Sequence, residues 1–475
     1  MANANTPRLE AALAEGLATL TFSDIPPELV KRTGLFVLDN FGVMLGASKA
    51  PAMAELHRSI QSWESNGRAT ILINGLRVSP ASAALANGSA AHALDYDDQH
   101  DSARIHTLCT VLPAALAAAE DVGKVSGREF LRAVIVGAEF SSRLGLCCPQ
   151  SLELGCHPTA ALGGLAAATA AALIYDLDSA RMLNAIAIAF VQMGGTTQSN
   201  IDGALTKRMG AGFAARNGVV AAHMARSGLS GPSRFLEGKA GLFQFYQRGN
   251  VIPGVLLDRL GQRWMFDDLS TKPFPCCRAS HAAIQIGLDL HQDDIHPDAI
   301  DSIEIRLGHV NWMMVGAPFN PIQTSPVVHA QFNAAYAFAE AVRYGAVGLE
   351  TFDTERIMGA DRQFIQRISC IDAPEIDGAS VAGVVVSVKM RDGTTIRRQK
   401  DTVKGSPQEP MSQEEIISKF RACVAFGIGG LPASIDSFID LVLHLDDLDE
   451  VDTLITAFPK HSDSRQAAGL QFVPT

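Results

Sequence analysis

Three stretches of the chain are rich in alanine and other apolar residues, and the first of them, with Gly88 and Ser89, must pack closely against other helices. The three stretches lie at residues 80–94, 108–119 and 158–174. Alanine has the highest helix propensity of the amino acids, so each stretch predicts a helix. Helices with such small side chains pack with their backbones near one another. The sequence therefore predicts a core of closely packed helices.

Most of the remaining first half also has helical patterns. Helices are predicted over 8–20, from Ser23-Asp24 to residue 45, and over 127–146, 178–193 and 207–226, and a capping box at Ser412 opens another near the end of the chain. One hairpin interrupts this pattern. Asn74-Gly75 separates two short apolar runs within residues 69–78, which predicts a tight two-residue turn.

Strand patterns appear only in the middle of the chain. Alternating apolar residues predict strands at 303–307, 384–388 and 395–397, with helices near 280–290 and 326–342. Helical patterns return after residue 406. We therefore expect a mainly α protein, in which residues 1–270 and 406–475 form a large all-helical domain and residues 271–405 form a smaller inserted α+β domain.

Residues 95–106 form a short polar connector between two apolar helices. The connector holds four aspartates and two histidines within twelve residues. Carboxylate and imidazole groups that project from buried helix ends can act as acids and bases. Because Asp and His are also common in ordinary solvated helix connections, the spacing alone leaves both interpretations open.

Two further segments place polar groups at helix starts. His157 precedes Pro158 at the start of a predicted helix, where the neutral imidazole is favoured, as a general base or a donor to a carboxylate requires. Lys207 and Arg208 open another predicted helix, whose free backbone N–H groups and two cations together resemble a common type of anion site. A capping histidine and two solvated surface cations are the structural alternatives.

Two other chemistries fit short motifs. Residues 97–101 match a DDxxD pattern, which can chelate Mg²⁺ in diphosphate chemistry, but no second acidic motif with suitable spacing accompanies it. Cys276-Cys277 lies beside Arg278 and near His281, as a thiol nucleophile would require. Since nothing else indicates acyl or redox transfer, we interpret this segment as a domain junction that lines a cleft.

Charge and cysteine content argue against several partners. The net charge is −11 and the cations are scattered, so nothing indicates binding to nucleic acid or to an anionic membrane. No stretch reaches the roughly 18 apolar residues of a membrane span. Residues 1–20 also lack the basic leader and uninterrupted apolar core of a secretory signal. The eight cysteines form no CxxC spacing, so we expect a reduced cytosolic setting, or a eukaryotic organelle, without structural zinc.

Several motifs follow one another in an order that is specific when they are taken together. They are Ala91-His92-Ala93-Leu94-Asp95-Tyr96-Asp97-Asp98, His106 followed by Val111-Leu112-Pro113-Ala114, Gly155-Cys156-His157-Pro158-Thr159, Thr206-Lys207-Arg208 with Gly212-Phe213-Ala214-Ala215-Arg216-Asn217-Gly218, and Pro275-Cys276-Cys277 with His281. Over most of the chain, this set resembles the MmgE/PrpD family. Members of that family include 2-methylcitrate dehydratase, cis-aconitate decarboxylase and iminodisuccinate epimerase.

The resemblance implies the two-domain fold described above, a cleft between the domains, a homodimer, and chemistry on small di- or tricarboxylates without a cofactor or metal. It also implies a set of site residues. Catalytic roles would fall to Asp95, His106, His157 and Lys207, and substrate binding to Gln99, Arg208 and His281. Gln99 replaces a hydroxyl-bearing residue of the family, and His106-Thr107-Leu108 stands where many members have His-Pro-Ser, which leaves the exact substrate open.

All three reactions of the family pass through a carbanion next to a carboxylate or along an allylic system, so they need an acid or base at carbon and cations for the carboxylates. We expect Lys207 and Arg208 to anchor carboxylates, and His157 with Asp95 to orient the reacting end. His106 would move the proton, because the ordinary pKa of histidine is near neutrality. The prediction is a cofactor-independent lyase, a dehydratase or decarboxylase of a 2-methylcitrate-like or cis-aconitate-like acid. An epimerase of a small dicarboxylate and a carboxylate-binding protein without turnover are the alternatives.

Overall fold

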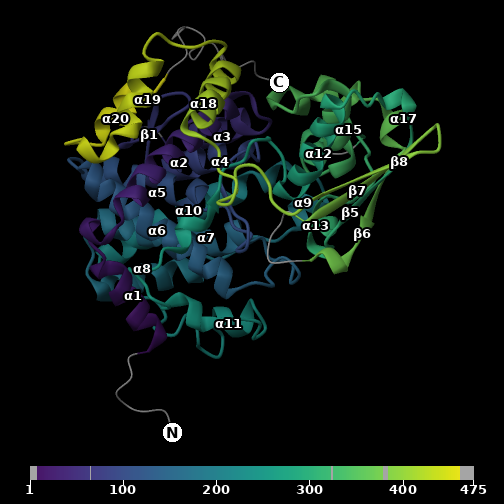
Figure 1. The fold of residues 1–475 in the computed structure, drawn as a ribbon. Coiled ribbons are helices and arrows are strands. Elements are labelled where there is room, and N and C mark those ends of the chain that lie inside the picture. Colours follow the sequence, from purple (N-terminus) through teal and green to yellow (C-terminus); the bar gives the residue numbers. More distant parts are fainter. Residues whose placement is uncertain (1–7, 65, 323–324, 378–382, 460–475) are drawn as a thin grey trace.

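Helices form most of the chain in the computed structural model, which describes residues 8–64, 66–322, 325–377 and 383–459 (Figure 1). The first half contains α1 (Leu9–Thr19), α2 (Pro27–Gly46), α3 (Met53–Trp63), α4 (Pro80–Ala93), α5 (Leu108–Val122), α6 (Gly127–Cys147), α7 (Pro158–Ile174), α8 (Ser179–Val191), α9 (Gln198–Ile201), α10 (Met209–Arg226) and α11 (Leu242–Phe245). The predicted mainly α fold is confirmed. α3 has no counterpart among the predicted helices; of its side chains only Met53 and Ile60 are buried.

The alanine-rich helices α4, α5, α7 and α10 pack against one another at the centre of the helical part. A Cβ atom at Gly212 of α10 would lie 2.2 Å from the carbonyl oxygen of Leu85 in α4, and one at Gly218 would lie 2.5 Å from Ala167 Cβ in α7. Only glycine therefore permits these backbone distances. The predicted close packing is confirmed, and it brings the end of α4 to the start of α10.

The predicted hairpin forms, but its turn is longer. β1 (Ala69–Ile71) and β2 (Leu76–Val78) pair antiparallel and are joined by residues 72–75, so the prediction of a two-residue turn was wrong. The Leu72 amide donates to the Asn87 side chain of α4 at 2.9 Å instead of to the opposite strand. This bond ends the strand pairing early.

The middle of the chain forms a four-stranded sheet covered by helices. The strands, in spatial order, are β6 (Ile368–Asp372), β5 (Ile300–Leu307), β7 (Val384–Met390) and β8 (Thr395–Lys400); β5 and β6 are parallel and the other pairs are antiparallel. The helices are α12 (His281–Gln292), α13 (His309–Val315), α14 (Pro326–Gln331), α15 (Ala334–Tyr344), α16 (Thr354–Met358) and α17 (Arg362–Ile365). α12 and α15 pack on each other and on the sheet. β6 has no counterpart among the predicted strands; Ile368 is its one buried residue.

The helix predicted over 326–342 is divided in two. α14 ends at Gln331 and α15 begins at Ala334. Between them, Asn333 has an extended backbone and its side chain accepts a hydrogen bond from the Tyr336 amide at 2.9 Å. This cap starts a new helix and leaves Phe332 in the break, where its ring lines the candidate site described below.

The end of the chain returns to the helical part. α18 (Gln413–Ile428) and α19 (Ile435–Leu443) pack on α2, and α20 (Asp452–Ala457) follows (Figure 1). The predicted capping box is confirmed, because the Ser412 hydroxyl accepts from the Glu415 amide at 3.2 Å and the Glu415 carboxylate accepts from the Ser412 amide at 2.7 Å. Buried apolar side chains form two clusters. One runs from Leu13 to Leu269 and includes Leu349 and residues 420–458; the other lies within 274–403.

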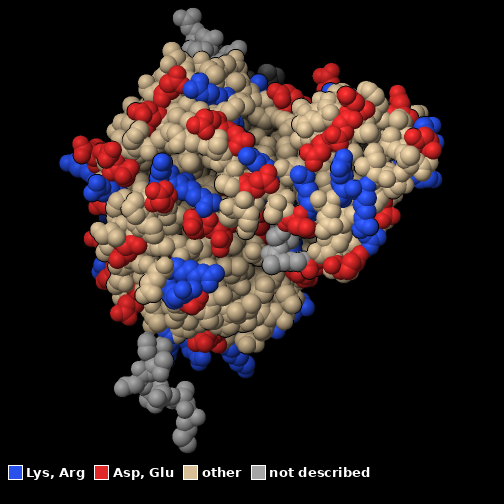
Figure 2. All heavy atoms as spheres, in the orientation of Figure 1, with Lys and Arg blue, Asp and Glu red and all other residues tan. Residues whose placement is uncertain are grey.

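Charges of both signs are interspersed on the face of the molecule shown in Figure 2. All eight cysteines are free thiols. Among the described residues, no helix combines the length and the apolar character needed to cross a membrane.

Candidate active site

A buried carboxylate, that of Asp95, lies between two lysines just after α4. Lys207 Nζ donates to Asp95 Oδ2 at 2.8 Å, and Lys272 Nζ donates to Asp95 Oδ1 and, at 2.9 Å, to the Asp95 carbonyl oxygen. All three side chains are at most 3% exposed. Burial disfavours the ionised carboxylate, but Lys207 and Lys272 outweigh it and hold the pKa of Asp95 well below its ordinary value. Asp95 is therefore ionised, and two ammonium groups are fixed beside it.

Three distant segments meet at this carboxylate. Asp95 leaves α4 in the left-handed conformation, with φ 52°. Lys207 ends a short 3₁₀ turn, Leu205–Lys207, directly before α10. Lys272 follows β4 (Leu269–Ser270), which pairs with β3 (Gln99–His100) of the polar connector. The two lysines lie 112 and 177 residues from Asp95 in the sequence, so their ion pairs fix how these segments sit together.

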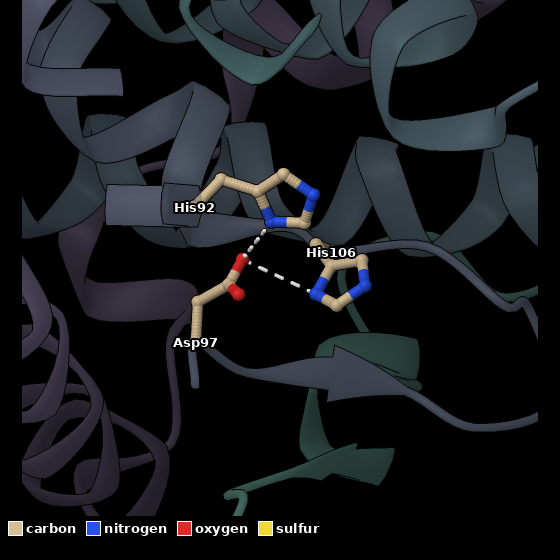
Figure 3. A group of neighbouring side chains, drawn as sticks. All are labelled: His92, Asp97 and His106. Atoms are coloured by element: carbon tan, nitrogen blue, oxygen red, sulfur yellow. Dashed lines mark hydrogen bonds and ion pairs between the residues drawn. The ribbon is translucent and has the colours of Figure 1, made fainter. Parts of the chain in front are cut away.

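The protonation of His92 follows from its two neighbours. Its Nε2 lies 3.0 Å from Lys207 Nζ, and because an ammonium group can only donate, Nε2 is the acceptor. The ring proton is therefore on Nδ1, which donates to Asp97 Oδ2 at 2.9 Å (Figure 3). Burial is the main cause that lowers the pKa of His92 to about 4, so the ring is neutral near neutral pH.

His106 presents one ring nitrogen to the site. Its Nδ1 lies 2.8 Å from the Asp98 carbonyl oxygen and 3.1 Å from Asp97 Oδ2, so Nδ1 faces two acceptors and carries a proton. Figure 3 shows Nε2 on the side of the ring away from Asp97. The His106 side chain is 11% exposed, whereas the His92 side chain is fully buried. Nε2 of His106 is therefore the nitrogen available to a ligand.

A cavity of about 50 Å³ brings most of the predicted site residues together. Its lining consists of Asp95, Gln99, Arg104, His106, Leu152, His157, Pro158, Lys207, Cys277, Ala279, Asn311, Met314 and Phe332. Five of these, Asp95, Gln99, His106, His157 and Lys207, are site residues that the sequence analysis named. The cavity thus joins two histidines, a carboxylate and an ammonium group that are far apart in the sequence.

His157 occupies the N-cap position of α7, and its ring centroid lies 6.1 Å from that of His92. Its Nδ1 is buried and has no hydrogen-bond partner among the described residues. Loss of solvation and the nearby Lys207 hold the pKa of His157 well below its ordinary value. His157 is therefore a neutral ring at the cavity wall with unused hydrogen-bonding capacity.

Arg208 and His281, both predicted to bind substrate, do not line this cavity. Successive residues in a helical turn point about 100° apart, and Arg208 turns away from Lys207 to donate to the Pro51 carbonyl oxygen at 3.1 Å and to Gln331 Oε1 at 3.4 Å. His281 lies at the start of α12, fully buried, with Nε2 3.2 Å from the Cys276 carbonyl oxygen. The structure therefore separates these two residues from the other five.

Arg104 is a cavity residue that the sequence analysis missed. Its backbone has a left-handed conformation (φ 51°) within the polar connector, and its side chain lines the cavity. In the described part of the chain, the guanidinium has no hydrogen bond or ion pair of its own. Burial lowers its pKa from the ordinary value, but an arginine remains charged. A single arginine in a loop gives no signal in the sequence, whereas in the structure it is an unpaired cation facing the site.

The carboxylates of the DDxxD motif do not converge on one point. Asp98 accepts from the Thr107 amide at 3.0 Å and from Asn40 Nδ2 at 3.0 Å, and Asp101 pairs with Arg278 at 3.2 Å. Asp97 lies with His92 and His106 in a group whose ligand atoms are all within 4.8 Å of one another, which is close enough to hold a metal ion. However, both Nδ1 atoms carry protons that point at acceptors, so these atoms form hydrogen bonds.

The adjacent thiols are poorly suited to nucleophilic attack. Burial raises the pKa of Cys276 well above its ordinary value and raises that of Cys277 to about 11. Both sulfurs are therefore protonated near neutral pH, and the thiolate is the reactive form. The interpretation of this segment as a junction beside a cleft fits the position of Cys277, which lines the cavity.

Comparisons with known proteins match most of the chain to a single family. The profile of the MmgE/PrpD N-terminal domain matches residues 11–253, and that of the MmgE/PrpD C-terminal domain matches residues 274–445. A cis-aconitate decarboxylase-like protein of Aspergillus oryzae, oryM, is 29% identical over 440 residues, which cover 86% of this chain and 89% of that protein. The cis-aconitate decarboxylase of Homo sapiens is 27% identical over 465 residues, 94% of each chain. That of Aspergillus terreus is 26% identical over 489 residues, 93% of each chain.

Lowering the pH from about 6.5 to about 4 should destabilise the protein through His92. The folded pKa of this residue, about 4, lies below the ordinary value of 6.5, so within this window the unfolded chain binds a proton that the folded chain does not. The free energy of unfolding should therefore fall as the pH falls, by up to about 3 kcal/mol from this group, and should be unaffected by it above pH 6.5. Chemical denaturation of the wild type and of His92→Gln at several pH values measures this difference. His444→Gln, a change at an exposed histidine, is the control, and equal pH dependence in His92→Gln and the wild type would contradict the assignment.

Proposed function

The chain belongs to the MmgE/PrpD family, and on that premise we propose that it is a lyase that decarboxylates cis-aconitate or a closely related unsaturated tricarboxylate. One observation carries the proposal: the guanidinium of Arg104, the ammonium of Lys207 and the imidazole of His106 line a single cavity. Cations that hold carboxylates, together with a proton donor, are what this reaction requires. Similarity to three relatives named for cis-aconitate decarboxylation supports this choice within the family.

The proposed reaction breaks one carbon–carbon bond. The bond between the methylene carbon of cis-aconitate and its carboxylate breaks, and CO₂ leaves. The electron pair moves through the double bond to the vinylic carbon, and this carbon takes up one proton. The carbanion that develops lies next to a second carboxylate, so cations at that carboxylate lower the barrier. Atoms and charge balance with a single proton, and no cofactor enters the proposed scheme.

Arg104 and Lys207 bind substrate carboxylates in this proposal. An ammonium group has three donors, and Lys207 uses two of them on Asp95 and His92, which leaves one for the cavity. The guanidinium of Arg104 can donate two parallel hydrogen bonds to one carboxylate. Gln99 and His157 orient the substrate from the same cavity wall.

His106 delivers the proton in the proposed mechanism. Nε2 is its open nitrogen, since Nδ1 is held by Asp97 and by the Asp98 carbonyl oxygen. Asp97 can balance the positive charge of the ring when both nitrogens carry protons. Proton transfer of this kind contributes roughly 10²- to 10⁴-fold to a rate.

The two hydrophobic clusters support a proposed division into domains, with residues 1–270 and 406–475 in one and 271–405 in the other. Hydrogen exchange should therefore reveal two cooperative units.

We further propose a homodimer. Its support is apolar side chains left exposed on two helices in contact, with Phe213 and Met224 of α10 exposed by 40% and 41% and Val191 of α8 by 68%. Light scattering should therefore give twice the mass of one chain.

Incubation with cis-aconitate, 2-methylcitrate and iminodisuccinate tests the type of reaction. We expect mass spectrometry to show loss of CO₂ from cis-aconitate, with one deuterium incorporated from deuterated solvent. Activity should survive exhaustive chelation, because no proposed step draws on a metal ion. Loss of water from 2-methylcitrate would instead indicate a dehydratase, and solvent exchange in iminodisuccinate without loss of mass would indicate an epimerase. Calorimetric binding of these acids without any product would leave only a carboxylate-binding protein.

His106→Asn should reduce turnover by roughly 10²- to 10⁴-fold, because it removes a proton-transfer group. Asparagine places an amide N–H near the position of Nδ1, so it can preserve the donor to Asp97 and Asp98 while the nitrogen at the position of Nε2 is lost. The melting temperature should therefore stay near that of the wild type. His444→Asn is the matched control, since this side chain is exposed. Full activity of a folded His106→Asn variant would exclude His106 as the proton donor.

Arg104→Gln should raise KM by about tenfold to hundredfold with little change in kcat, because charge-assisted hydrogen bonds contribute about 1.5–3 kcal/mol to binding. Arg104→Lys should recover only part of the loss, since an ammonium group cannot form the paired bonds. Arg259→Gln is the control, because Arg259 also has a left-handed backbone (φ 46°) but lies on the surface. An unchanged KM in Arg104→Gln would show that this cation does not contact the substrate.

A further inference from the structure

A second cavity, of about 540 Å³, adjoins the candidate active site. The two cavities share three apolar lining residues, Leu152, Met314 and Phe332. Phe332 lies on the border between them: Lys207 Nζ is 4.7 Å from its ring centroid, and the same ring lines the larger cavity. A ligand that reaches past these three side chains would occupy both cavities.

The two cavities differ in chemistry. The smaller cavity contains Arg104, Lys207 and two histidines, whereas no Asp, Glu, Lys or Arg is among the described residues that line the larger one. The larger cavity has one imidazole, that of His329, whose Nε2 accepts from the Asn320 amide at 2.9 Å and whose pKa is lowered by burial. His329 is therefore neutral. None of the described residues that line the larger cavity is a cation that could hold a carboxylate.

The walls of the larger cavity suit an apolar group. They include Trp312 and two methionines of α13, and methionine side chains adapt to ligands of different shape. The polar side chains among the described lining residues are the uncharged Thr197, Asn200 and His329. Ile201 is 72% exposed and Met313 is 44% exposed, although large apolar side chains gathered at one place are usually covered. An apolar chain in the cavity would cover them.

We propose that the substrate is an alkyl-substituted relative of cis-aconitate, whose carboxylates occupy the smaller cavity and whose alkyl chain occupies the larger one. This inference rests on the proposed decarboxylase function. Unsubstituted cis-aconitate would leave the apolar cavity unfilled. Burial of one methylene group contributes about 0.8 kcal/mol, which corresponds to about fourfold in affinity.

The experiment compares kcat/KM for cis-aconitate with that for homologues carrying unbranched alkyl groups of increasing length. One series has the substituent on the methylene carbon and a second has it on the vinylic carbon. We expect kcat/KM to rise by about fourfold per methylene in one of the two series until the cavity is filled. If cis-aconitate is decarboxylated but neither series improves with length, this inference fails and the proposed function stands. If no member of either series is decarboxylated, the proposed function fails as well.

A cavity-filling variant locates the alkyl group. Ala317 lines the larger cavity but not the smaller one, and it is exposed, so Ala317→Phe should fold normally. This variant should lose the gain with chain length and keep the wild-type kcat/KM for cis-aconitate. Ala433→Phe, at an exposed alanine outside both cavities, is the matched control. A length preference that persists unchanged in Ala317→Phe would show that the alkyl chain binds elsewhere.

Discussion

The burial of one carboxylate between two ammonium groups fixes the geometry of the whole site. A charge removed from water is tolerated only when it is paired, and leaving one partner alone costs about 3–5 kcal/mol. Asp95 is paired with both Lys207 and Lys272. The end of α4, the start of α10 and the segment after β4 are therefore held together by electrostatics as well as by packing. The cavity is the space that this arrangement leaves in front of Lys207.

The direction of each hydrogen bond around Lys207 follows from the ammonium group. Because Lys207 donates to His92 Nε2, His92 must donate from Nδ1 to Asp97. Asp97 is thereby an acceptor toward His106 Nδ1, which leaves His106 Nε2 for the ligand. His106 lies three hydrogen bonds from Lys207, and its Nδ1 also faces the Asp98 carbonyl oxygen, so Nε2 is the nitrogen that can exchange a proton with a substrate. This order explains why His92 belongs to the site although it does not line the cavity.

The sequence predicted the helices well, because alanine content, helix caps and apolar spacing are local signals. It also identified five of the cavity residues, but it did so through motifs of the family, since charge and spacing alone left a solvated loop as an equal alternative. Lys272 and Arg104 were missed for a physical reason. Lys272 matters because it pairs with Asp95, 177 residues away in the sequence. Arg104 matters because its side chain lines a cavity whose other residues come from distant segments. Arg208 illustrates the reverse case, because its adjacency to Lys207 suggested a shared role that the rotation of about 100° between successive helical residues prevents.

The net charge of −11 does not oppose a polyanionic ligand at this site. At physiological salt, charges more than about 8 Å away are largely screened, so the local balance decides. At the site, Lys207 and Lys272 share the single carboxylate of Asp95, and Arg104 interacts at longer range with Glu153, Asp377 and Asp101, while His92 and His157 are neutral. The cations next to the cavity lie in a buried space where charges interact more strongly than in water. The described residues that line the adjoining cavity include no charged side chain. A carboxylate that entered the larger cavity would lose its hydration without gaining a cation, whereas an apolar group would not bear this cost. The ionic part of a ligand is therefore directed to the smaller cavity and the apolar part to the larger one.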